Sequence, residues 1–217
     1  MRLPKQKKTV RCKWIFKRKE GLSPSEPPRF KARLVAKGFS QISGVDYNDV
    51  FSPVVKHSSI RTFFSIVDMY DLELEQLDVK TAFLHGELEE EMYMDKPEGF
   101  IVPCKEDYVC KLKRSLYGLK QSPRQCYKRF DSLMLSHGFK RSDYDSCVYI
   151  KLVDGSHIYL LLYVDDMLIS TKSREQITAL KKLLNSEFDM KDLGAAKKIL
   201  DMEITRDRNS GLLFLSQ

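Results

Sequence analysis

The stretch IYLLLYVDDMLIST, residues 158–171, places two adjacent carboxylates, Asp165 and Asp166, in the middle of an otherwise apolar run. Such a run predicts two buried strands, Ile158–Val164 and Met167–Thr171, joined by a tight turn at the Asp pair. Two like charges at the tip of a buried hairpin repel each other, and their ionised forms are costly unless a cation neutralises them. The nearest Lys along the chain is Lys172, so the sequence offers no local partner.

Two explanations of the Asp pair stay open on these residues alone. Asp tolerates the positive φ of a hairpin loop, so the pair can be turn chemistry. A third carboxylate, Asp78, ends the alternating stretch LELEQLD, and a central position for that strand could bring Asp78, Asp165 and Asp166 to one point. Mg²⁺ takes one or two carboxylates and completes its octahedron with waters and phosphates, and two such ions about 3.5–4 Å apart promote in-line phosphoryl transfer.

Three capping signals predict three helices. The first helix is expected to begin at Ser58 or Ser59, the second at Ser122 in the motif SPRQ, and the third at Ser173 in the motif SREQ. Gly138 is expected to stop the second helix. The expected core-facing residues are, helix by helix, Ile60, Phe63, Phe64 and Val67; Cys126, Phe130, Leu133 and His137; and Ile177, Leu180 and Leu184.

The order of these elements predicts the fold class. Strands are expected at residues 72–79, 109–113, 147–152, 158–164 and 167–171, with a closing hairpin from 199 to 215. Helices and strands in this order, with hairpin-length gaps late in the chain, indicate an α+β fold with an antiparallel sheet. A chain of 217 residues, 42% hydrophobic, is long enough for one sizeable domain. Its five Cys residues follow no metal-binding spacing, which favours reduced thiols.

Basic residues are concentrated at the N-terminus. Residues 1–40 hold 13 Lys and Arg against 2 Asp and Glu, a local charge of +11 in a chain of net charge +7, which leaves −4 for the remaining 177 residues. Two basic strands, KWIFKRK at 13–19 and FKARLVAKGF at 30–39, flank the turn-rich linker 20–29 and predict a hairpin. Period two places Lys31 and Arg33 on one face, opposite Leu34. The hairpin is either a binding surface for a polyanion or a solvated basic tail.

Several motifs resemble those of one enzyme family. The stretch LYVDDM (162–167) resembles the YVDD box of reverse transcriptases, and QLDVKTAFLHG (76–86) is similar to the aspartate motif that precedes it. The stretches FKARLVAKGFSQ (30–41), SLYGLKQSPRQ (115–125) and FDMKDLGAAKKIL (188–200) are similar to polymerases of copia-type LTR retrotransposons. The five motifs follow in the family's order, so the chain resembles the reverse transcriptase domain of a copia-type Pol polyprotein.

The resemblance implies a fold and a set of partners. It implies one domain, 1–217, with right-hand polymerase fingers at roughly 1–57 and 84–121 and a palm at roughly 58–83 and 122–217, whose antiparallel sheet is backed by helices and which lacks a thumb. The implied activity is RNA-directed DNA polymerase. The implied partners are an RNA or DNA template with primer, dNTPs, and the integrase and ribonuclease H segments of the parent polyprotein. No apolar stretch reaches a membrane span, so we expect no membrane partner and a cytoplasmic, particle-associated or nuclear location.

The resemblance also implies roles for individual residues. Three carboxylates would be catalytic and would bind two Mg²⁺ ions, with Mn²⁺ as an alternative. Phe83 would crowd the sugar 2′ position, although a core Phe is the commoner use of such a residue. Lys191 would donate a proton to pyrophosphate. The implied metal ligands are Asp78, Asp165 and Asp166; the candidates for the triphosphate are Arg18, Lys31 and Arg33; and the candidates beneath the nucleotide are Gly118 and Gln121.

Three positions depart from the family pattern. Asp201 and Cys104 stand where relatives usually have Gly, and Cys126 stands where they usually have Trp. The sequence also begins inside the expected fingers and ends before a thumb, which suggests a piece of a polyprotein. These features favour one alternative to an active polymerase, a catalytically inactive remnant that binds nucleic acid through its basic fingers. Another alternative is an unrelated two-metal nuclease, which would not need the basic hairpin or Phe83.

Overall fold

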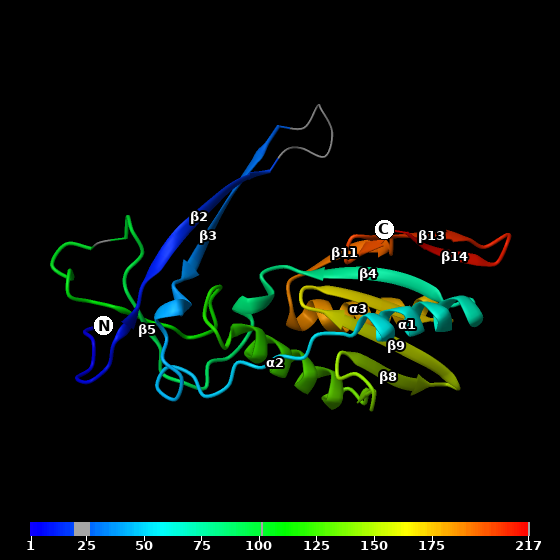
Figure 1. Cartoon of the computed structure of the whole chain (residues 1–217), viewed down its shortest axis with the longest axis horizontal. Helices are drawn as coiled ribbons and strands as arrows, with labels where there is room; N and C mark the ends of the chain where they lie inside the picture. The colour runs from blue at the N-terminus through cyan, green and yellow to red at the C-terminus, as the bar shows by residue number, and fades with distance from the viewer. Residues whose placement is uncertain (20–26, 101, 217) are drawn as a thin grey trace. The chain divides into compact units, whose positions relative to one another are not determined.

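The computed structural model describes residues 1–19, 27–100 and 102–216 and divides into two compact units (Figure 1). Unit 1 comprises Met1–Phe51 and Phe83–Cys126, and unit 2 comprises Ser52–Ala82 and Tyr127–Gln217. Most of the expected linker at 20–29 lies outside the described residues. No helix in the described part of the chain is long and apolar enough to cross a membrane.

Unit 2 is built on a six-stranded antiparallel sheet in the order β11-β4-β10-β9-β8-β7. A second, three-stranded antiparallel sheet, β12-β13-β14, follows it along the chain. Together with the helices, these sheets confirm the predicted mixture of helices and antiparallel strands. The bounds are β4 Glu73–Val79, β7 Lys140–Arg141, β8 Val148–Val153, β9 Ser156–Tyr163, β10 Asp166–Thr171, β11 Met190–Ala195, β12 Lys198–Ile199, β13 Met202–Asp207 and β14 Leu212–Ser216.

Three α-helices occur among the described residues: α1 His57–Met69, α2 Ser122–Ser136 and α3 Arg174–Glu187. The predicted start of α3 is confirmed, because the Ser173 side chain accepts a hydrogen bond from the Gln176 backbone N–H at 3.4 Å. The predicted core stripes of α1 and α3 are also confirmed in full, and Gly138 follows α2 with φ +78°. Local sequence therefore determines much of the helical structure.

The predicted starts of α1 and α2 were wrong. The N-cap of α1 is Lys56, whose backbone N–H donates to the Asp145 carboxylate at 2.9 Å, so a distant side chain sets this start in place of Ser58 or Ser59. Ser122 is the first residue inside α2, and its hydroxyl donates to the Leu116 carbonyl at 2.7 Å.

The core stripe of α2 also differs from the prediction. Phe130 and Met134 are buried at 2% and 0% exposure, whereas His137 is exposed. Cys126, which stands where relatives usually have Trp, is only half-buried and so lies at the edge of the buried stripe. The buried face of α2 therefore differs from the predicted one, because Met134 and not Leu133 packs into the interior.

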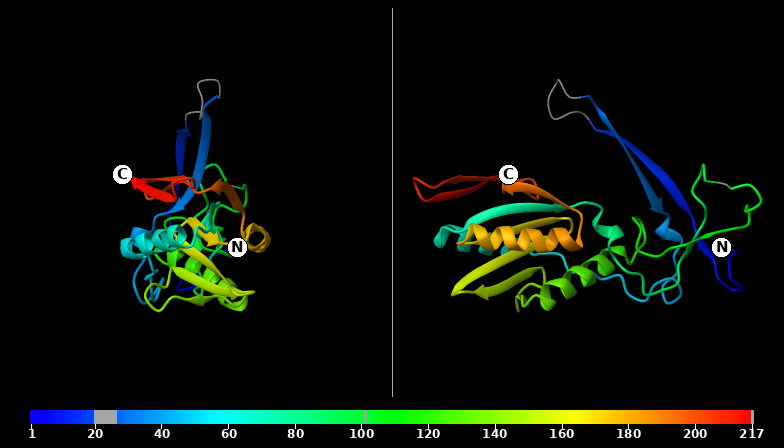
Figure 2. Two further views of the ribbon diagram at one scale, coloured as in Figure 1. Left: turned by 90° about the vertical axis from the view of Figure 1, so that its right-hand side faces the viewer. Right: turned by 180° about the vertical axis from the view of Figure 1, so that it is seen from behind.

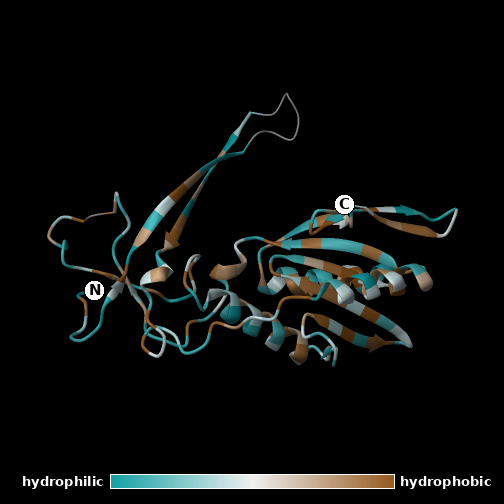
Figure 3. Cartoon of the chain, viewed as in Figure 1, coloured by the Kyte–Doolittle hydropathy of each residue, from teal (hydrophilic) through white to brown (hydrophobic). Residues whose placement is uncertain are grey.

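Different helices pack on the two faces of the six-stranded sheet. One face carries Leu77 of β4, Met167 of β10 and Tyr149 of β8, and helices α2 and α3 cover it. Phe130 of α2 packs edge-on against Tyr149, with ring centroids 5.6 Å apart, and α3 contacts β10. On the other face, Phe63 and Ile66 of α1 line a cavity together with Tyr159 of β9. The left view of Figure 2 shows α1 and α3 on opposite sides of the sheet, and Figure 3 shows the alternation of apolar and polar residues along its strands.

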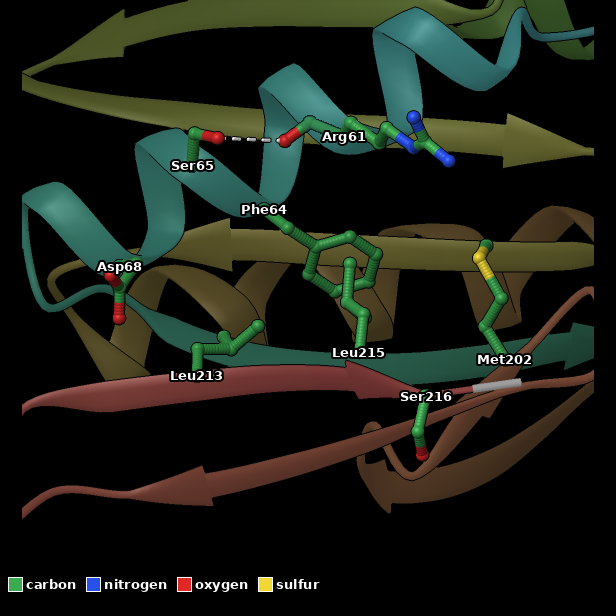
Figure 4. A pocket seen from close by; sticks show the side chains of 8 residues that line it. All are labelled: Arg61, Phe64, Ser65, Asp68, Met202, Leu213, Leu215 and Ser216. Atoms are coloured by element: carbon green, nitrogen blue, oxygen red, sulfur yellow. Dashed lines mark hydrogen bonds between the residues drawn. The ribbon is translucent and has the colours of Figure 1, made fainter.

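The C-terminal strands are anchored on α1. Helix α1 and the strands β13 and β14 enclose a pocket of about 480 Å³ (Figure 4). Its apolar lining includes Phe64, Met202 and Leu215, and its rim carries Arg61 and Asp68. Because Phe64 also belongs to the buried stripe of α1, the same helix contributes to the core of the unit and supports this sheet.

Unit 1 has little regular structure apart from a ribbon and a small sheet. The ribbon is formed by β2 Cys12–Lys19 and β3 Arg29–Ala36, which confirms the predicted basic hairpin. The small sheet joins β1 Thr9–Val10, β5 Tyr93–Met94 and β6 Cys110–Lys111, so the strand expected at 109–113 is shorter than predicted. The small core of this unit contains Val10, Ala36, Met92 and Leu119. A short 3₁₀ turn lies at Gly38–Ser40 in this unit, and a second, Ala82–Leu84, lies where the chain passes from unit 2 to unit 1.

Two hairpin loops need residues that tolerate positive φ, and their sequences meet this need to different degrees. Leu200 and Asp201 join β12 to β13 with φ of +50° and +62°, a pair of positive values that matches a type I′ turn. The loop between β8 and β9 has the favoured Asp154–Gly155 for the same geometry. Cys104 also has φ +62°. Two of the three positions that depart from the family pattern therefore have a left-handed backbone, which favours Gly.

We predict that Asp201→Gly stabilises unit 2. Gly removes the left-handed penalty, roughly 1 kcal/mol for an L residue and less for Asp, while the exposed Lys198–Asp201 ion pair at 2.9 Å contributes little. Urea unfolding should show a higher free energy of unfolding. Asp201→Ala, which removes the charge but keeps a Cβ, is the matched control. Equal stability of the two variants would show that backbone strain is not the cause.

Candidate active site

The central hairpin of the sheet carries two of the predicted catalytic residues. Its loop is Val164–Asp165 and not the Asp pair, because Tyr163 and Asp166 are the last paired residues of β9 and β10. Val164 has φ +54°, a conformation that is strongly disfavoured for a β-branched residue. The Val79 backbone N–H donates to the Asp165 carbonyl at 2.8 Å, which ties the loop to β4. The turn explanation therefore does not account for Asp166, which lies within a strand.

Strand pairing aligns Asp166 with the third predicted carboxylate. Asp166 lies directly opposite Asp78 of β4, and Asp78 in turn lies opposite Lys191 of β11. Residues paired in this way project from the same face of a sheet. A row of Tyr163, Asp166, Asp78 and Lys191 therefore crosses four strands, with two like charges at its centre. Like charges directly opposite each other are destabilising, so this arrangement favours a bound cation.

A buried amide contacts the Asp166 carboxylate. The Gln76 side chain is 6% exposed, and its Nε2 donates to Asp166 Oδ1 at 3.2 Å. Burial raises the pKa of Asp166, the Gln76 hydrogen bond lowers it, and the nearby Asp78 carboxylate raises it, with a net upward shift. Sequence reasoning missed Gln76, although its position two residues before Asp78 on an alternating strand puts both side chains on one face.

Two of the three carboxylates, Asp78 and Asp166, meet the needs of a hard divalent cation. Asp78, Asp165 and Asp166 are all half-buried, and Oδ1 of Asp165 is shielded from solvent. Within residues 1–19, 27–100 and 102–216, no three His, Cys, Asp or Glu side chains are grouped closely enough to hold an ion by themselves. Mg²⁺ needs only one or two carboxylates, since waters and substrate phosphates complete its shell. The Asp78–Asp166 pair meets that requirement.

The ribbon in unit 1 has two chemically different faces. Lys31 lies opposite Lys17 and Arg33 opposite Ile15, which builds a cationic face. Arg18 lies opposite Phe30 on the other face. The structure thus places Lys31 and Arg33 together and separates Arg18 from them.

The opposite face of the ribbon is aromatic. It carries Trp14 and Phe16, whose rings stack with centroids 6.4 Å apart, and also Phe30. Phe16 is 76% exposed and Phe30 is 82% exposed. Exposed aromatic side chains gathered on one face are characteristic of binding surfaces.

Phe83 belongs to a small cluster in unit 1. Its ring meets Tyr117 edge-on with centroids 5.3 Å apart, and the Arg33 guanidinium carbon lies 6.0 Å from the centre of the Tyr117 ring. The next residue, Gly118, has φ +90°, and a Cβ there would lie 2.1 Å from the Ala36 carbonyl oxygen. The structure therefore brings Phe83, Arg33 and Gly118 into one region through Tyr117, which sequence reasoning missed.

Comparison with known proteins identifies the family. The whole chain, residues 1–217, matches the family described as "Reverse transcriptase (RNA-dependent DNA polymerase)". The chain belongs to the reverse transcriptase family. This confirms the resemblance on which the residue assignments rest.

The similar proteins are transposon polyproteins. The chain is 56% identical over 216 residues to the retrovirus-related Pol polyprotein from transposon TNT 1-94 of Nicotiana tabacum, covering 99% of the chain and 16% of that protein. It is 40% identical over 197 residues to the Pol polyprotein from transposon RE1 of Arabidopsis thaliana, covering 91% of the chain and 13% of that protein. It is 32% identical over 136 residues to a putative transposon Ty5-1 protein of Saccharomyces cerevisiae, covering 63% of the chain and 44% of that protein. The chain thus spans about a sixth or less of the two plant polyproteins.

Gln121 of this reverse transcriptase family member is fully buried. It is 0% exposed, and its Oε1 accepts from Gln41 Nε2 at 2.9 Å. Its own Nε2 donates to the Asp46 carbonyl at 3.1 Å. These bonds join segments that lie about 80 residues apart in the chain, as the separation of Gln41 and Gln121 shows. The Gln121 side chain therefore links loops within unit 1, and its place beneath a nucleotide stays a prediction.

We predict that Asp166→Asn gains stability relative to the parent as pH rises. The pKa of Asp166 is raised above its ordinary value of 3.8 in the folded chain. Between these two values the folded chain keeps the Asp166 proton, whereas the unfolded chain has lost it. The free energy of unfolding therefore falls as pH rises through the folded pKa. Asn does not titrate and escapes this loss. Urea unfolding from pH 4 to 7 without divalent ions measures the difference.

Asp192→Asn is the control with the opposite sign. Burial raises the pKa of Asp192, but hydrogen bonds from Lys181 and the Gly194 N–H and the charge of Lys181 outweigh it, so the net shift is downward. Asp192 therefore contributes stability above its ordinary pKa, and its Asn variant should lose stability at pH 7. Parallel pH curves for the parent and Asp166→Asn would contradict the first prediction.

Proposed function

We propose that this chain is the polymerase domain of a copia-type Pol polyprotein and transfers nucleotides from dNTPs to a primer 3′ end on an RNA or DNA template. The observation that carries the proposal is the cross-strand pair Asp78–Asp166 beside the Asp165 loop, within a chain of the reverse transcriptase family. Two carboxylates held opposite each other are poorly suited to a purely structural role, because they repel. They are well suited to a cation that carries phosphates.

The two units take the roles of fingers and palm. Unit 2, with the carboxylates on its central sheet, acts as the palm, and unit 1, with the basic ribbon, acts as the fingers. The cationic face of the ribbon, including Lys31 and Arg33, binds phosphates of the nucleic acid or of the incoming nucleotide. The integrase and ribonuclease H segments of a parent polyprotein are the other expected partners.

The chain's own residues divide the chemical work. Asp78, Asp165 and Asp166 would hold two Mg²⁺ ions, which when bound supply Lewis-acid stabilisation of the phosphates and of the attacking and leaving oxygens. Lys191, whose backbone lies opposite Asp78, donates a proton to the departing pyrophosphate. Support for this division comes from the cross-strand row of Asp166, Asp78 and Lys191 on three neighbouring strands, with Asp165 in the adjoining loop between β9 and β10.

Nucleotide selection falls to the Phe83 cluster. Phe83 is half-buried, and its ring packs edge-on against Tyr117. A rigid aromatic ring beside the sugar excludes a 2′-hydroxyl by steric contact. Gly118 allows the loop to approach β3 closely, which keeps Arg33 near Tyr117.

Primer extension with Asp165→Asn tests the proposed activity. The purified chain should extend a primer on an RNA template with Mg²⁺, and Asp165→Asn should reduce the rate at least about 100-fold, since loss of an outer-shell partner alone costs about 10–100-fold. Mg²⁺ or Mn²⁺ should raise the melting temperature of the parent but not of the variant. Asp143→Asn, at an exposed position in the same unit, is the control. A folded parent without extension or metal response would point to an inactive remnant.

Salt dependence tests the role of the ribbon. Binding to a primer–template duplex should weaken with salt, and Lys17→Ala or Lys31→Ala should each reduce the slope of log K against log salt by about 0.9 if that residue neutralises one phosphate. Phe16→Ala, on the opposite face, should leave the slope unchanged. Unchanged slopes in both Lys variants would remove the cationic face from the binding site.

A further inference from the structure

The amide of Gln76 is placed where it can control the Asp166 carboxylate. Gln76 lies on β4 two residues before Asp78, and its backbone is paired with Leu168 of β10 on one side and Gly194 of β11 on the other. A buried polar side chain needs a partner, since an unsatisfied buried amide costs about 1–3 kcal/mol. At 6% exposure Gln76 directs its Nε2 to Asp166 Oδ1 at 3.2 Å.

This hydrogen bond distinguishes the two oxygens of Asp166. An ionised carboxylate has two equivalent oxygens and can rotate to offer either or both to a cation. With Oδ1 engaged by Gln76, rotation of the carboxylate breaks a partly buried hydrogen bond. Oδ2 is the oxygen left for an ion, so Asp166 is prepared to bind through one oxygen.

The neutral amide also preserves the charge of the site. A Lys or Arg at position 76 would neutralise Asp166 and compete with a divalent cation for it. An apolar residue of the same size would fill the space but leave the carboxylate without an anchor. Gln satisfies both needs, because it donates a hydrogen bond and leaves the negative charge in place.

We propose that Gln76 is a positioning residue that fixes Asp166 for single-oxygen binding of a divalent cation. The inference rests on the proposed two-metal function and deepens it by naming a residue that acts on the ion through Asp166. Outer partners of this kind orient metal ligands, and their loss typically weakens metal binding about 10–100-fold.

A double-mutant cycle tests the proposal with Mn²⁺ binding as the readout. Free Mn²⁺ is counted by electron paramagnetic resonance for the full chain, Gln76→Met, Asp166→Asn and the double variant. Gln76→Met keeps the length of the side chain and removes the amide. It should weaken Mn²⁺ binding about tenfold in the parent but less than about twofold in the Asp166→Asn background. Leu74→Met, a volume-conserving change on the same strand and face, is the control and should bind as the parent does.

A second variant, together with circular dichroism, separates loss of the Gln76 hydrogen bond from a change of fold. Gln76→Asn keeps the amide but is one methylene too short to reach Asp166, and it should weaken Mn²⁺ binding as Gln76→Met does. Circular dichroism spectra that match the parent establish that the variants are folded. The proposal is overturned if either folded variant binds Mn²⁺ within about twofold of the parent, or if Gln76→Met has its full effect in the Asp166→Asn background.

The same titration separates this inference from the proposed function. Mn²⁺ binding that is lost in Asp165→Asn but kept in Gln76→Met leaves the metal site standing and removes only the role of Gln76. A folded parent that binds no Mn²⁺ overturns the two-metal function and the role of Gln76 together.

Discussion

The register of β4 against β10 is the constraint on which the site depends. It sets Asp78 opposite Asp166 and, one step along, Leu77 opposite Met167. Like charges facing each other across strands are destabilising, and cross-strand pairs are typically worth about 0.2–1 kcal/mol. On the reverse face Leu77, Met167 and Ile169 are each at most 1% exposed, and burial of such side chains is worth about 1.5–3 kcal/mol apiece. Apolar packing behind the sheet therefore outweighs the repulsion in front of it and holds the carboxylates together.

The sequence predicted elements whose causes lie within a few residues. The third helix is the clearest example, because Ser173, Gln176 and the stripe that includes Leu180 specify its start and its buried face locally. The start of α1 could not be predicted in this way, since the Asp145 that accepts from Lys56 lies 89 residues further along the chain. The prediction for α1 thus failed where a contact distant in sequence lies at the start of the helix.

In the candidate site, too, the sequence predicted the features that depend on nearby residues and missed those that depend on distant contacts. Alternation along β4 and the apolar run 158–171 brought Asp78 and the Asp pair into consideration, and the family motifs made them candidates together. The exact position of the loop, Val164–Asp165, depends on pairing and on the bond from Val79, neither of which periodicity reveals. Gln121 adds a contact that its motif did not reveal, because its buried side chain accepts a hydrogen bond from Gln41, about 80 residues away in the chain.

The two-faced ribbon limits how this part of the chain can change length. Successive residues of β2 and β3 point alternately to the cationic and the aromatic side, as the opposed pairs Lys17–Lys31 and Phe16–Ala32 show. Insertion of a single residue within either strand would transfer every later side chain of that strand to the wrong side. Two-residue insertions preserve the alternation. Insertions and deletions within these two strands of viable descendants should therefore come in even numbers of residues.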